Sequence, residues 1–309
     1  MKTAFLFPGQ GAQLVGMGKD IADAFEVAAG IFSQANEIVG YDLSSICFEG
    51  PEDKLNTTTV SQPAIFTMSA AILAVMKDKA PQIVPDVTAG LSMGEYTALY
   101  AAGVMSFEEG LKLVQARGNA MQAAADATDG AMVSIIGLDE EKVNELCAEA
   151  SQGELLVAVN FNCPGQIVVS GTKTACQRAS ELAEKYGAMK AVVLAVAGAF
   201  HSEMMNPAAE DLAKALEGTN IEAPADIKVL ANVDTEYYNG AEQIRSGLVG
   251  QLVKPILWQK SMEKLLAEGV ESYYEIGPNR VLTGLMRRIN RKTKVINISD
   301  AASLSEIAG

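Results

Sequence analysis

Short apolar runs alternate with segments whose apolar residues recur every three or four positions over most of this chain. The short runs predict buried strands, and the periodic segments predict amphipathic helices that pack against them. The strands predicted in this way are 4–7, 84–89, 227–232, 273–276 and 294–298. The predicted helices are 20–39, 61–79, 95–102, 106–125, 207–216, 242–253, a helix after Trp258, and 280–290. This alternation indicates an α/β fold built on a parallel sheet.

Two helix starts are predicted from side chains that can cap a first turn. Ser61 is the expected N-cap of helix 61–79, with Pro63 at an early helical position. Ser106 and Glu109 have the spacing of a capping box at the start of helix 106–125. Both signals set a helix boundary independently of the hydrophobic pattern.

The order of the predicted strands and helices changes between residues 130 and 197. The elements predicted there are strand 131–136, helix 139–150, strands 155–161 and 165–170, helix 172–186 and strand 189–196. This β-α-β-β-α-β order is that of a split βαβ, or ferredoxin-like, unit. We therefore expect an α/β chain with two parts. A large α/β-hydrolase-like domain with a parallel sheet core spans 1–128 and 198–309, and a small ferredoxin-like subdomain, 129–197, is inserted into it.

The composition excludes several classes of partner. With 49% hydrophobic and 20% charged residues among 309, the chain can bury a large core. Its formal net charge of −14 argues against nucleic acid as the main partner, because the phosphate backbone attracts clustered positive charge. No apolar run approaches the roughly 20 residues of a membrane span, and the N-terminal run is too short for a signal peptide. We expect a cytoplasmic protein that binds neither nucleic acid nor membranes.

The cysteines and the histidine argue against a metal site. Cys47, Cys147, Cys163 and Cys176 lie far apart and lack Cys-x-x-Cys spacing, which predicts reduced thiols in a cytoplasmic protein. The chain has only 1 histidine. A zinc site, which needs several such ligands close together, is therefore not expected.

A Gly-x-Ser-x-Gly pentapeptide, 90–94, lies between the predicted strand 84–89 and the predicted helix 95–102. In a strand–turn–helix context this pattern is typical of a nucleophile elbow, which exposes the serine hydroxyl above the sheet. The glycines on either side of Ser92 allow the strand and the helix to approach closely. Taken alone, the pattern also fits an ordinary turn between a strand and a helix.

The single histidine, His201, is the candidate base for Ser92. A serine hydroxyl is a poor nucleophile unless a neighbouring base takes its proton, and imidazole is the usual base near neutral pH. His201 follows the apolar run 192–200 and precedes a new helix. Sites in α/β folds are built where strands end, so this position favours a catalytic histidine over one that only packs in the core.

The loop 8–13 follows the first predicted strand and is rich in glycine. Leu14 stands where a third glycine of a dinucleotide-binding loop would be, and no Gly-Lys-Ser/Thr follows, so we do not expect a nucleotide site. A loop at this end of a strand can instead offer backbone N–H groups to a developing oxyanion.

Arg117 falls on the apolar face of helix 106–125, among residues that recur at helical spacing. A buried guanidinium needs an anionic or polar partner, because an unpaired buried charge is too costly to persist. Two interpretations follow from the sequence. Arg117 forms an internal salt bridge, or it binds a substrate carboxylate through two parallel hydrogen bonds.

A dense basic cluster stands near the C-terminus of this acidic chain. Its members are Arg287, Arg288, Arg291, Lys292 and Lys294. Such a cluster is either a solvated helix end or a docking patch for an anionic partner or a ligand phosphate. The sequence alone leaves both interpretations open.

Six short motifs are spread over essentially the whole chain. They are Phe7-Pro8-Gly9-Gln10-Gly11-Ala12-Gln13, Gly90-Leu91-Ser92-Met93-Gly94-Glu95-Tyr96, Gln115-Ala116-Arg117-Gly118, Asn160-Phe161-Asn162, Ala199-Phe200-His201-Ser202 and Gln251-Leu252. In this order and spacing they resemble the malonyl-CoA:acyl carrier protein transacylases, the stand-alone acyltransferases of type II fatty acid synthesis. One departure is Leu91, where many members have histidine. That position takes no part in the chemistry, so no catalytic assignment is weakened.

The resemblance implies roles for the residues that match the family's motifs. Ser92 would be the nucleophile and His201 its general base and acid. Arg117 would bind the malonyl carboxylate. The backbone N–H groups of Gln10 and Met93 would form the oxyanion hole that stabilises the tetrahedral intermediate.

Three further positions acquire expected roles from the same resemblance. The main-chain carbonyl of Gln251 would orient His201, in place of the aspartate of a catalytic triad. Phe200 matches the version of its motif that favours malonyl over the bulkier methylmalonyl group. Asn160 is expected to contact the substrate.

The resemblance also implies a two-step transfer between two partners. The malonyl group would move from malonyl-CoA to Ser92, and from there to the phosphopantetheine thiol of acyl carrier protein. No permanently bound cofactor is expected, since the carrier protein brings its own phosphopantetheine. We expect the chain to act as a monomer.

Three other functions are compatible with parts of this pattern. A serine esterase or thioesterase would need a carboxylate to orient the histidine and would have no buried arginine. An acyltransferase for another acyl group would share the whole catalytic set. A non-catalytic carrier-docking module would require none of Ser92, His201 and Arg117, so their joint presence argues against it.

Overall fold

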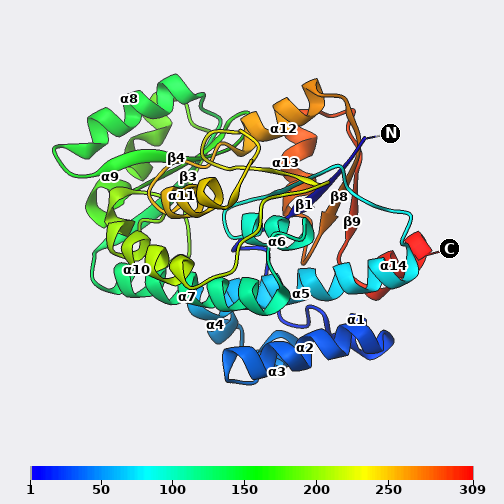
Figure 1. Ribbon diagram of the computed structural model, residues 1–309. Coiled ribbons are helices and arrows are strands. Elements are labelled where there is room, and N and C mark those ends of the chain that lie inside the picture. Colours follow the sequence, from blue (N-terminus) through cyan, green and yellow to red (C-terminus); the bar gives the residue numbers. More distant parts are fainter. Residues whose placement is uncertain (1, 309) are drawn as a thin grey trace.

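A parallel sheet of five strands forms the centre of the larger part of the molecule (Figure 1), in a computed structural model that describes residues 2–308. The strands lie in the order β7-β2-β1-β8-β9, and neighbouring strands pair in parallel. Their bounds are β1 Lys2–Phe7, β2 Val87–Gly90, β7 Lys228–Leu230, β8 Val270–Ile276 and β9 Val295–Ile298. The predicted α/β class with a parallel sheet core is thereby confirmed.

Helices cover both faces of this sheet. They are α1 Lys19–Ala24, α2 Glu26–Val39, α3 Leu43–Glu49, α4 Glu52–Leu55, α5 Thr58–Lys79, α6 Gly94–Ala101, α7 Phe107–Asp126, α10 Asn206–Glu217, α11 Ala241–Gln251, α12 Trp258–Ala267, α13 Val281–Ile289 and α14 Ala301–Ala308. Alternate residues of β1 point to opposite faces. Phe5 and Phe7 join the core formed with α5 and α7, whereas Ala4 and Leu6 join the core formed with α12 and α13.

The second sheet is antiparallel, with strand order β4-β5-β3-β6. Its elements are β3 Gly130–Ile136, α8 Glu140–Ser151, β4 Leu156–Cys163, β5 Gln166–Thr172, α9 Lys173–Leu182, the short 3-10 helix η1 Ala183–Tyr186 and β6 Lys190–Val193. The element order is the split βαβ order expected from the sequence. Figure 1 shows this part, in green, at one side of the central sheet. The division of the chain at residues 129 and 197 stays a prediction.

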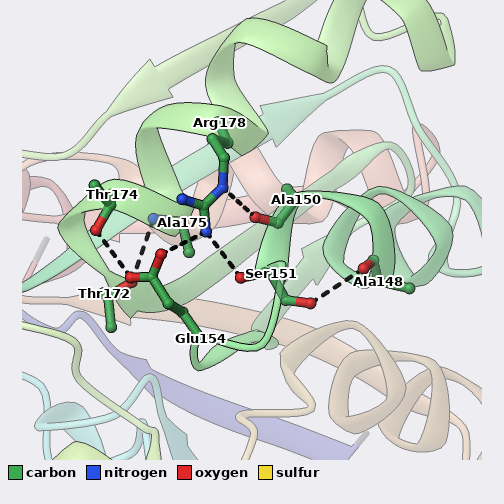
Figure 2. A network of polar contacts seen from close by, with 8 residues as sticks. All are labelled: Ala148, Ala150, Ser151, Glu154, Thr172, Thr174, Ala175 and Arg178. Carbon is green, nitrogen blue, oxygen red and sulfur yellow. Dashed lines mark hydrogen bonds and ion pairs between the residues drawn. The ribbon is translucent and has the colours of Figure 1, made fainter.

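A polar network ties the two helices of the small sheet together (Figure 2). Glu154 accepts hydrogen bonds from the hydroxyls of Thr172 (2.5 Å) and Thr174 (2.9 Å) and pairs with Arg178 at 2.7 Å. Arg178 also donates to the carbonyls of Ala150 and Ser151 at the end of α8. These partners lower the pKa of Glu154 to about 2, the Thr172 hydrogen bond contributing most.

The structure corrects several element boundaries. The segment predicted as one helix over 20–39 is divided at Phe25, whose backbone is extended and separates α1 from α2. Helix α5 starts at Thr58, so Ser61 lies inside the helix and is not its N-cap. Packing rather than a cap sets this start, because Ser61 and the residues around it are buried in the core. Strand β6 ends at Val193, short of the expected 196, and α3 and α4 were not predicted.

Helix α5 also corrects the statement that no apolar run is long enough to cross a membrane. By length and composition it meets that criterion. In the folded protein, however, 83% of its most apolar stretch is buried. Figure 1 shows α5 lying between the sheet and the α1–α3 layer, so its apolar surface belongs to the core.

Candidate active site

Ser92 lies in the sharp turn between β2 and α6, as its pentapeptide predicts. Its φ of 51° is in the left-handed region that few non-glycine residues adopt, which is typical of a nucleophile elbow. A Cβ on Gly90 would lie 1.9 Å from the carbonyl carbon of Gly94, and a Cβ on Gly94 would lie 2.1 Å from the carbonyl oxygen of Phe7. Both positions therefore require glycine, because β1, β2 and α6 approach too closely for any side chain.

Asn232, which follows β7, holds the turn at Ser92 in place through two hydrogen bonds. Its side-chain oxygen accepts a 2.7 Å hydrogen bond from the backbone N–H of Ser92, and its amide nitrogen donates to the carbonyl of Gly90 at 2.7 Å. No sequence motif pointed to this residue. Its place just beyond β7, at the edge where parallel strands end, was the available signal.

His201 is within hydrogen-bond distance of Ser92. The Nε2 atom lies 2.9 Å from the Ser92 Oγ, and the Nδ1 atom lies 2.7 Å from the main-chain carbonyl oxygen of Gln251. Since a carbonyl can only accept, Nδ1 carries the ring hydrogen and Nε2 is free to accept the hydroxyl hydrogen. The predicted contact of the Gln251 carbonyl with His201 is therefore present.

The surroundings of His201 keep its ring neutral. Burial first of all, and then the positive charge of Arg117, lower the pKa of His201 to about 4, against the opposing effect of the Gln251 carbonyl. A neutral imidazole is the form that can take a proton. His201 is therefore in its basic form throughout the neutral pH range.

The guanidinium of Arg117 lies in the same pocket, with 1% of the residue exposed. It donates to the Ser92 Oγ at 3.0 Å, to the side-chain oxygen of Gln251 at 2.9 Å and to that of Gln62 at 2.8 Å. Among residues 2–308, no carboxylate lies within 4.0 Å of it. The internal salt bridge considered from the sequence is therefore wrong, and the buried cation faces the pocket with neutral partners.

Two backbone N–H groups beside Ser92 donate no hydrogen bond within the described part of the chain. They belong to Gln10, in the loop after β1, and to Met93. The N–H of Ser92 itself is occupied by Asn232. The loop and the elbow are packed together, since a Cβ on Gly9 would lie 2.3 Å from the carbonyl oxygen of Leu91. Free donors at such a place suit an oxyanion.

Ser92, His201 and Arg117 open into a cavity of about 550 Å³ between the central sheet and the small sheet. Asn160 on β4 and Phe200 both line it, as do Gln10 and residues of α13. Seven of the eight predicted site residues line the cavity or contact a group that does, namely Gln10, Ser92, Arg117, Asn160, Phe200, His201 and Gln251. Met93 follows Ser92 directly.

Polar side chains behind the cavity were also missed by the sequence analysis. Gln62 on α5 holds the Arg117 guanidinium, and Glu95 on α6 is fully buried beside Gln251 and Tyr238. The sequence did contain one signal for Glu95, since it is the one acidic residue in the otherwise apolar start of α6. In the described region, no group of three or more His, Cys, Asp or Glu side chains is placed to hold a metal ion.

The basic cluster 287–294 starts beside the cavity, through the contact of Arg288 with Gln166. Arg288 donates to the side-chain oxygen of Gln166 at 2.8 Å and to the carbonyls of Pro164 (3.1 Å) and Gly165 (3.2 Å). Gln166 also lines the cavity. The five basic side chains are exposed, apart from these contacts. Arg288 thus connects α13 with the turn between β4 and β5.

Comparison with known proteins agrees with this geometry. A family model described as an acyl transferase domain matches residues 4–307. The chain is 44% identical over 306 residues to the malonyl CoA-acyl carrier protein transacylase of Haemophilus influenzae, covering 99% of this chain and 98% of that protein.

Solved structures give the same result. A malonyl-transacylase solved in complex with a type II polyketide acyl-carrier protein has a TM-score of 0.96 and 42% identity, and the match covers 100% of this chain and 99% of that one. The acyl carrier protein S-malonyltransferase of Vibrio cholerae has a TM-score of 0.94 and 42% identity over 99% of this chain and 100% of its own.

Proposed function

The chain belongs to the acyl transferase family, and on that premise we propose that it transfers a malonyl group from malonyl-CoA to the phosphopantetheine thiol of acyl carrier protein. It is thus an acyl carrier protein S-malonyltransferase that supplies fatty acid synthesis. One observation carries the proposal. A neutral imidazole and a buried guanidinium, which has no carboxylate partner among the described residues, both lie within hydrogen-bond distance of one serine hydroxyl in one cavity.

In the first step, the Ser92 oxygen attacks the thioester carbonyl of malonyl-CoA. His201 takes the hydroxyl proton on Nε2, and the N–H groups of Gln10 and Met93 stabilise the oxyanion that forms. The carbon–sulfur bond then breaks, and His201 returns the proton to the departing CoA thiolate. The product is a malonyl ester on Ser92 and free CoA.

In the second step, the carrier protein's thiol replaces CoA. His201 takes the thiol proton as the sulfur attacks the ester carbonyl, and the same N–H groups hold the second oxyanion. When the carbon–oxygen bond breaks, His201 gives the proton back to Ser92. The enzyme returns to its starting state, and no resident cofactor or metal is needed for either step.

Arg117 binds the free carboxylate of the malonyl group. In the unliganded protein its guanidinium donates to the Ser92 Oγ at 3.0 Å. A malonyl carboxylate is a stronger acceptor than a neutral hydroxyl, so it draws this donor away from the nucleophile. Pairing also offsets the positive charge that lowers the pKa of His201. The correct substrate therefore makes both the nucleophile and its base more reactive.

The remaining expectations are part of this proposal. Phe200 narrows the acyl site and so favours malonyl over methylmalonyl, and Asn160 contacts the substrate from β4. The chain acts in the cytoplasm. Its four cysteines, free and buried in the fold, suit a reducing compartment.

A serine esterase or thioesterase is disfavoured by two contacts. The group that accepts from His201 Nδ1 is a main-chain carbonyl and not a carboxylate. The buried Arg117 beside the nucleophile has no use in hydrolysis of an uncharged ester. An acyltransferase for another acyl group shares the same residues, so the acyl preference has to be measured directly.

We further propose that the basic cluster 287–294 is the docking patch for the acidic carrier protein. It lies beside the cavity that the phosphopantetheine arm has to enter. Charge complementarity of this kind mainly increases the association rate and weakens with salt. Reversing the charges of Arg287 and Arg291 should therefore raise the apparent KM for carrier protein at low salt. An unchanged KM would exclude this docking site.

Competition between acyl-CoAs tests the function itself. The protein is mixed with holo acyl carrier protein and equal amounts of malonyl-, methylmalonyl- and acetyl-CoA, and the acylated carriers are separated by mass. We expect malonyl carrier to dominate, with little free malonate when carrier protein is left out. A dominant acetyl or methylmalonyl product would assign a different acyl group, and rapid hydrolysis without carrier would assign a thioesterase.

A further inference from the structure

Glu95 is a fully buried acidic side chain that takes no direct part in the proposed transfer. It lies in the first turn of α6, behind Ser92, and 0% of the residue is exposed. Its Oε1 accepts a 2.5 Å hydrogen bond from the hydroxyl of Tyr238. Its Oε2 accepts hydrogen bonds from the side-chain nitrogen of Gln251 at 2.5 Å and the backbone N–H of Asn232 at 3.3 Å.

Gln251 links the carboxyl group of Glu95 to both Arg117 and His201. Its side-chain oxygen accepts from Arg117 at 2.9 Å, and its main-chain oxygen accepts from His201 Nδ1 at 2.7 Å. Its side-chain nitrogen also donates to the carbonyl of Ser92 at 3.0 Å. A guanidinium can only donate and a carboxylate can only accept. The amide of Gln251 therefore has one satisfactory orientation while Glu95 is ionised.

The charges around Gln251 complement each other. Arg117, on one side of the amide, is a buried cation with no carboxylate within 4.0 Å among the residues that the structure describes. Glu95, on the other side, receives only hydrogen-bond donors, which favour its ionised form against the effect of burial. The Gln251 amide thus separates a buried cation from a buried anion and hydrogen-bonds to both.

We propose that Glu95 is a positioning residue for the malonyl transfer described above. Through Gln251, its carboxylate holds the imidazole of His201 and the guanidinium of Arg117 where the transfer needs them. Glu95 contacts neither the substrate nor the reacting atoms. This inference rests on the proposed function, since it concerns the same site.

The proposal gives Glu95 a pH signature distinct from that of His201. Burial raises the pKa of Glu95 to about 7, whereas burial lowers the pKa of His201 to about 4. The titratable or charged groups that face Glu95 are Tyr238 beyond β7, Arg117 on α7 and Tyr96 on α6. If the ionised carboxylate is needed, acylation of Ser92 decreases as the pH falls through about 7, well above the pH at which His201 gains its proton.

The experiment compares Glu95→Gln and Tyr238→Phe with the unmodified protein. Two reactions of Ser92 are followed from pH 5 to 9 by rapid quenching and mass spectrometry. One is malonylation by malonyl-CoA, which uses both His201 and Arg117. The other is sulfonylation by phenylmethylsulfonyl fluoride, an uncharged reagent that depends on His201 and not on a carboxylate site.

Glu95→Gln should slow both reactions at pH 8 by roughly 10- to 100-fold, as expected for misplaced catalytic groups. It should also remove the inflection near pH 7. Tyr238→Phe keeps the carboxylate but removes a hydrogen bond that lowers its pKa. In that variant the inflection should move to higher pH, while the rate at pH 9 stays close to that of the unmodified protein.

Glu275→Gln is the matched control. Glu275 is also 0% exposed and lies at the end of β8, where it accepts from the backbone N–H groups of Leu282 and Thr283 at the start of α13. This variant should lower the melting temperature and leave the rate per folded molecule and the pH profile unchanged. It separates loss of stability from loss of positioning.

Three results would overturn the inference. One is a Glu95→Gln variant that keeps both rates and the pH profile. The second is a Glu95→Gln variant that loses only thermal stability, which is the result expected of Glu275→Gln. If Glu95→Gln does not fold, Tyr238→Phe decides, and an unshifted inflection would be the third. Failure of the proposed function is distinguishable, because the unmodified protein would then react with the sulfonyl fluoride but not with malonyl-CoA.

Discussion

Replacing Arg117 with alanine should separate malonyl transfer from acetyl transfer. The guanidinium is buried and lies 3.0 Å from the Ser92 Oγ, so a malonyl group esterified there places its carboxylate within reach of it. Breaking such a buried ion pair costs about 3–5 kcal/mol. Each 1.36 kcal/mol of lost transition-state stabilisation is a factor of ten, so malonyl transfer should fall by roughly two to four powers of ten.

Acetyl transfer should be unchanged or faster in the same variant. An acetyl group has no carboxylate for Arg117 to bind. Removing the guanidinium also removes a hydrogen bond to Ser92 and a charge that lowers the pKa of His201, so the base becomes stronger. The ratio of malonyl to acetyl transfer is therefore the informative quantity.

The assay measures kcat/KM for transfer of each acyl group to holo carrier protein. Arg178→Ala is the control, since Arg178 is a partly buried arginine on α9 that does not line the cavity. It should lower the melting temperature and leave the malonyl-to-acetyl ratio as it was. Equal losses of malonyl and acetyl transfer in Arg117→Ala would refute the reasoning and make Arg117 a structural residue.

Three further changes test other parts of the account. Gly94→Ala should lower the melting temperature strongly, because its Cβ would lie 2.1 Å from the carbonyl oxygen of Phe7 and overpacking costs about 1–3 kcal/mol or more; a near-normal thermal melt would contradict this. Glu154→Gln should destabilise the protein near neutral pH. Its pKa is lowered to about 2, so its contribution is present above the ordinary value of 4.5 and is lost as the pH falls through about 2, where the two melting temperatures should meet. Phe200→Ser should widen the acyl site and raise methylmalonyl transfer relative to malonyl transfer in the competition assay.

The sequence was informative where one short segment specifies both the backbone and the chemistry. The pentapeptide around Ser92 predicted a strand–turn–helix with glycines on either side, and the close contacts of Gly90 and Gly94 explain why. The order of strands and helices likewise sufficed for the α/β class and for the split βαβ unit. Both are properties of local pattern and of elements adjacent in the chain.

The buried polar residues that support the catalytic side chains could not be predicted in the same way. Asn232, Glu95 and Tyr238 act through contacts between segments more than 130 residues apart. Each is an ordinary polar residue at its own position, and its role appears only when the sheet brings the segments together. The start of α5 was misplaced for a related reason, since burial against the core determined it and a capping side chain did not.

Formation of a malonyl ester on Ser92 is the step on which the whole proposed transfer depends. The protein is exposed briefly to malonyl-CoA without carrier protein, quenched in acid, digested and analysed by mass spectrometry, with Ser92→Ala treated in parallel. We expect one malonyl group on the peptide that contains Ser92, none in the variant, and its loss when holo carrier protein is added before quenching. A serine that stays unmodified while CoA is released, or a malonyl group found on another residue, would contradict it.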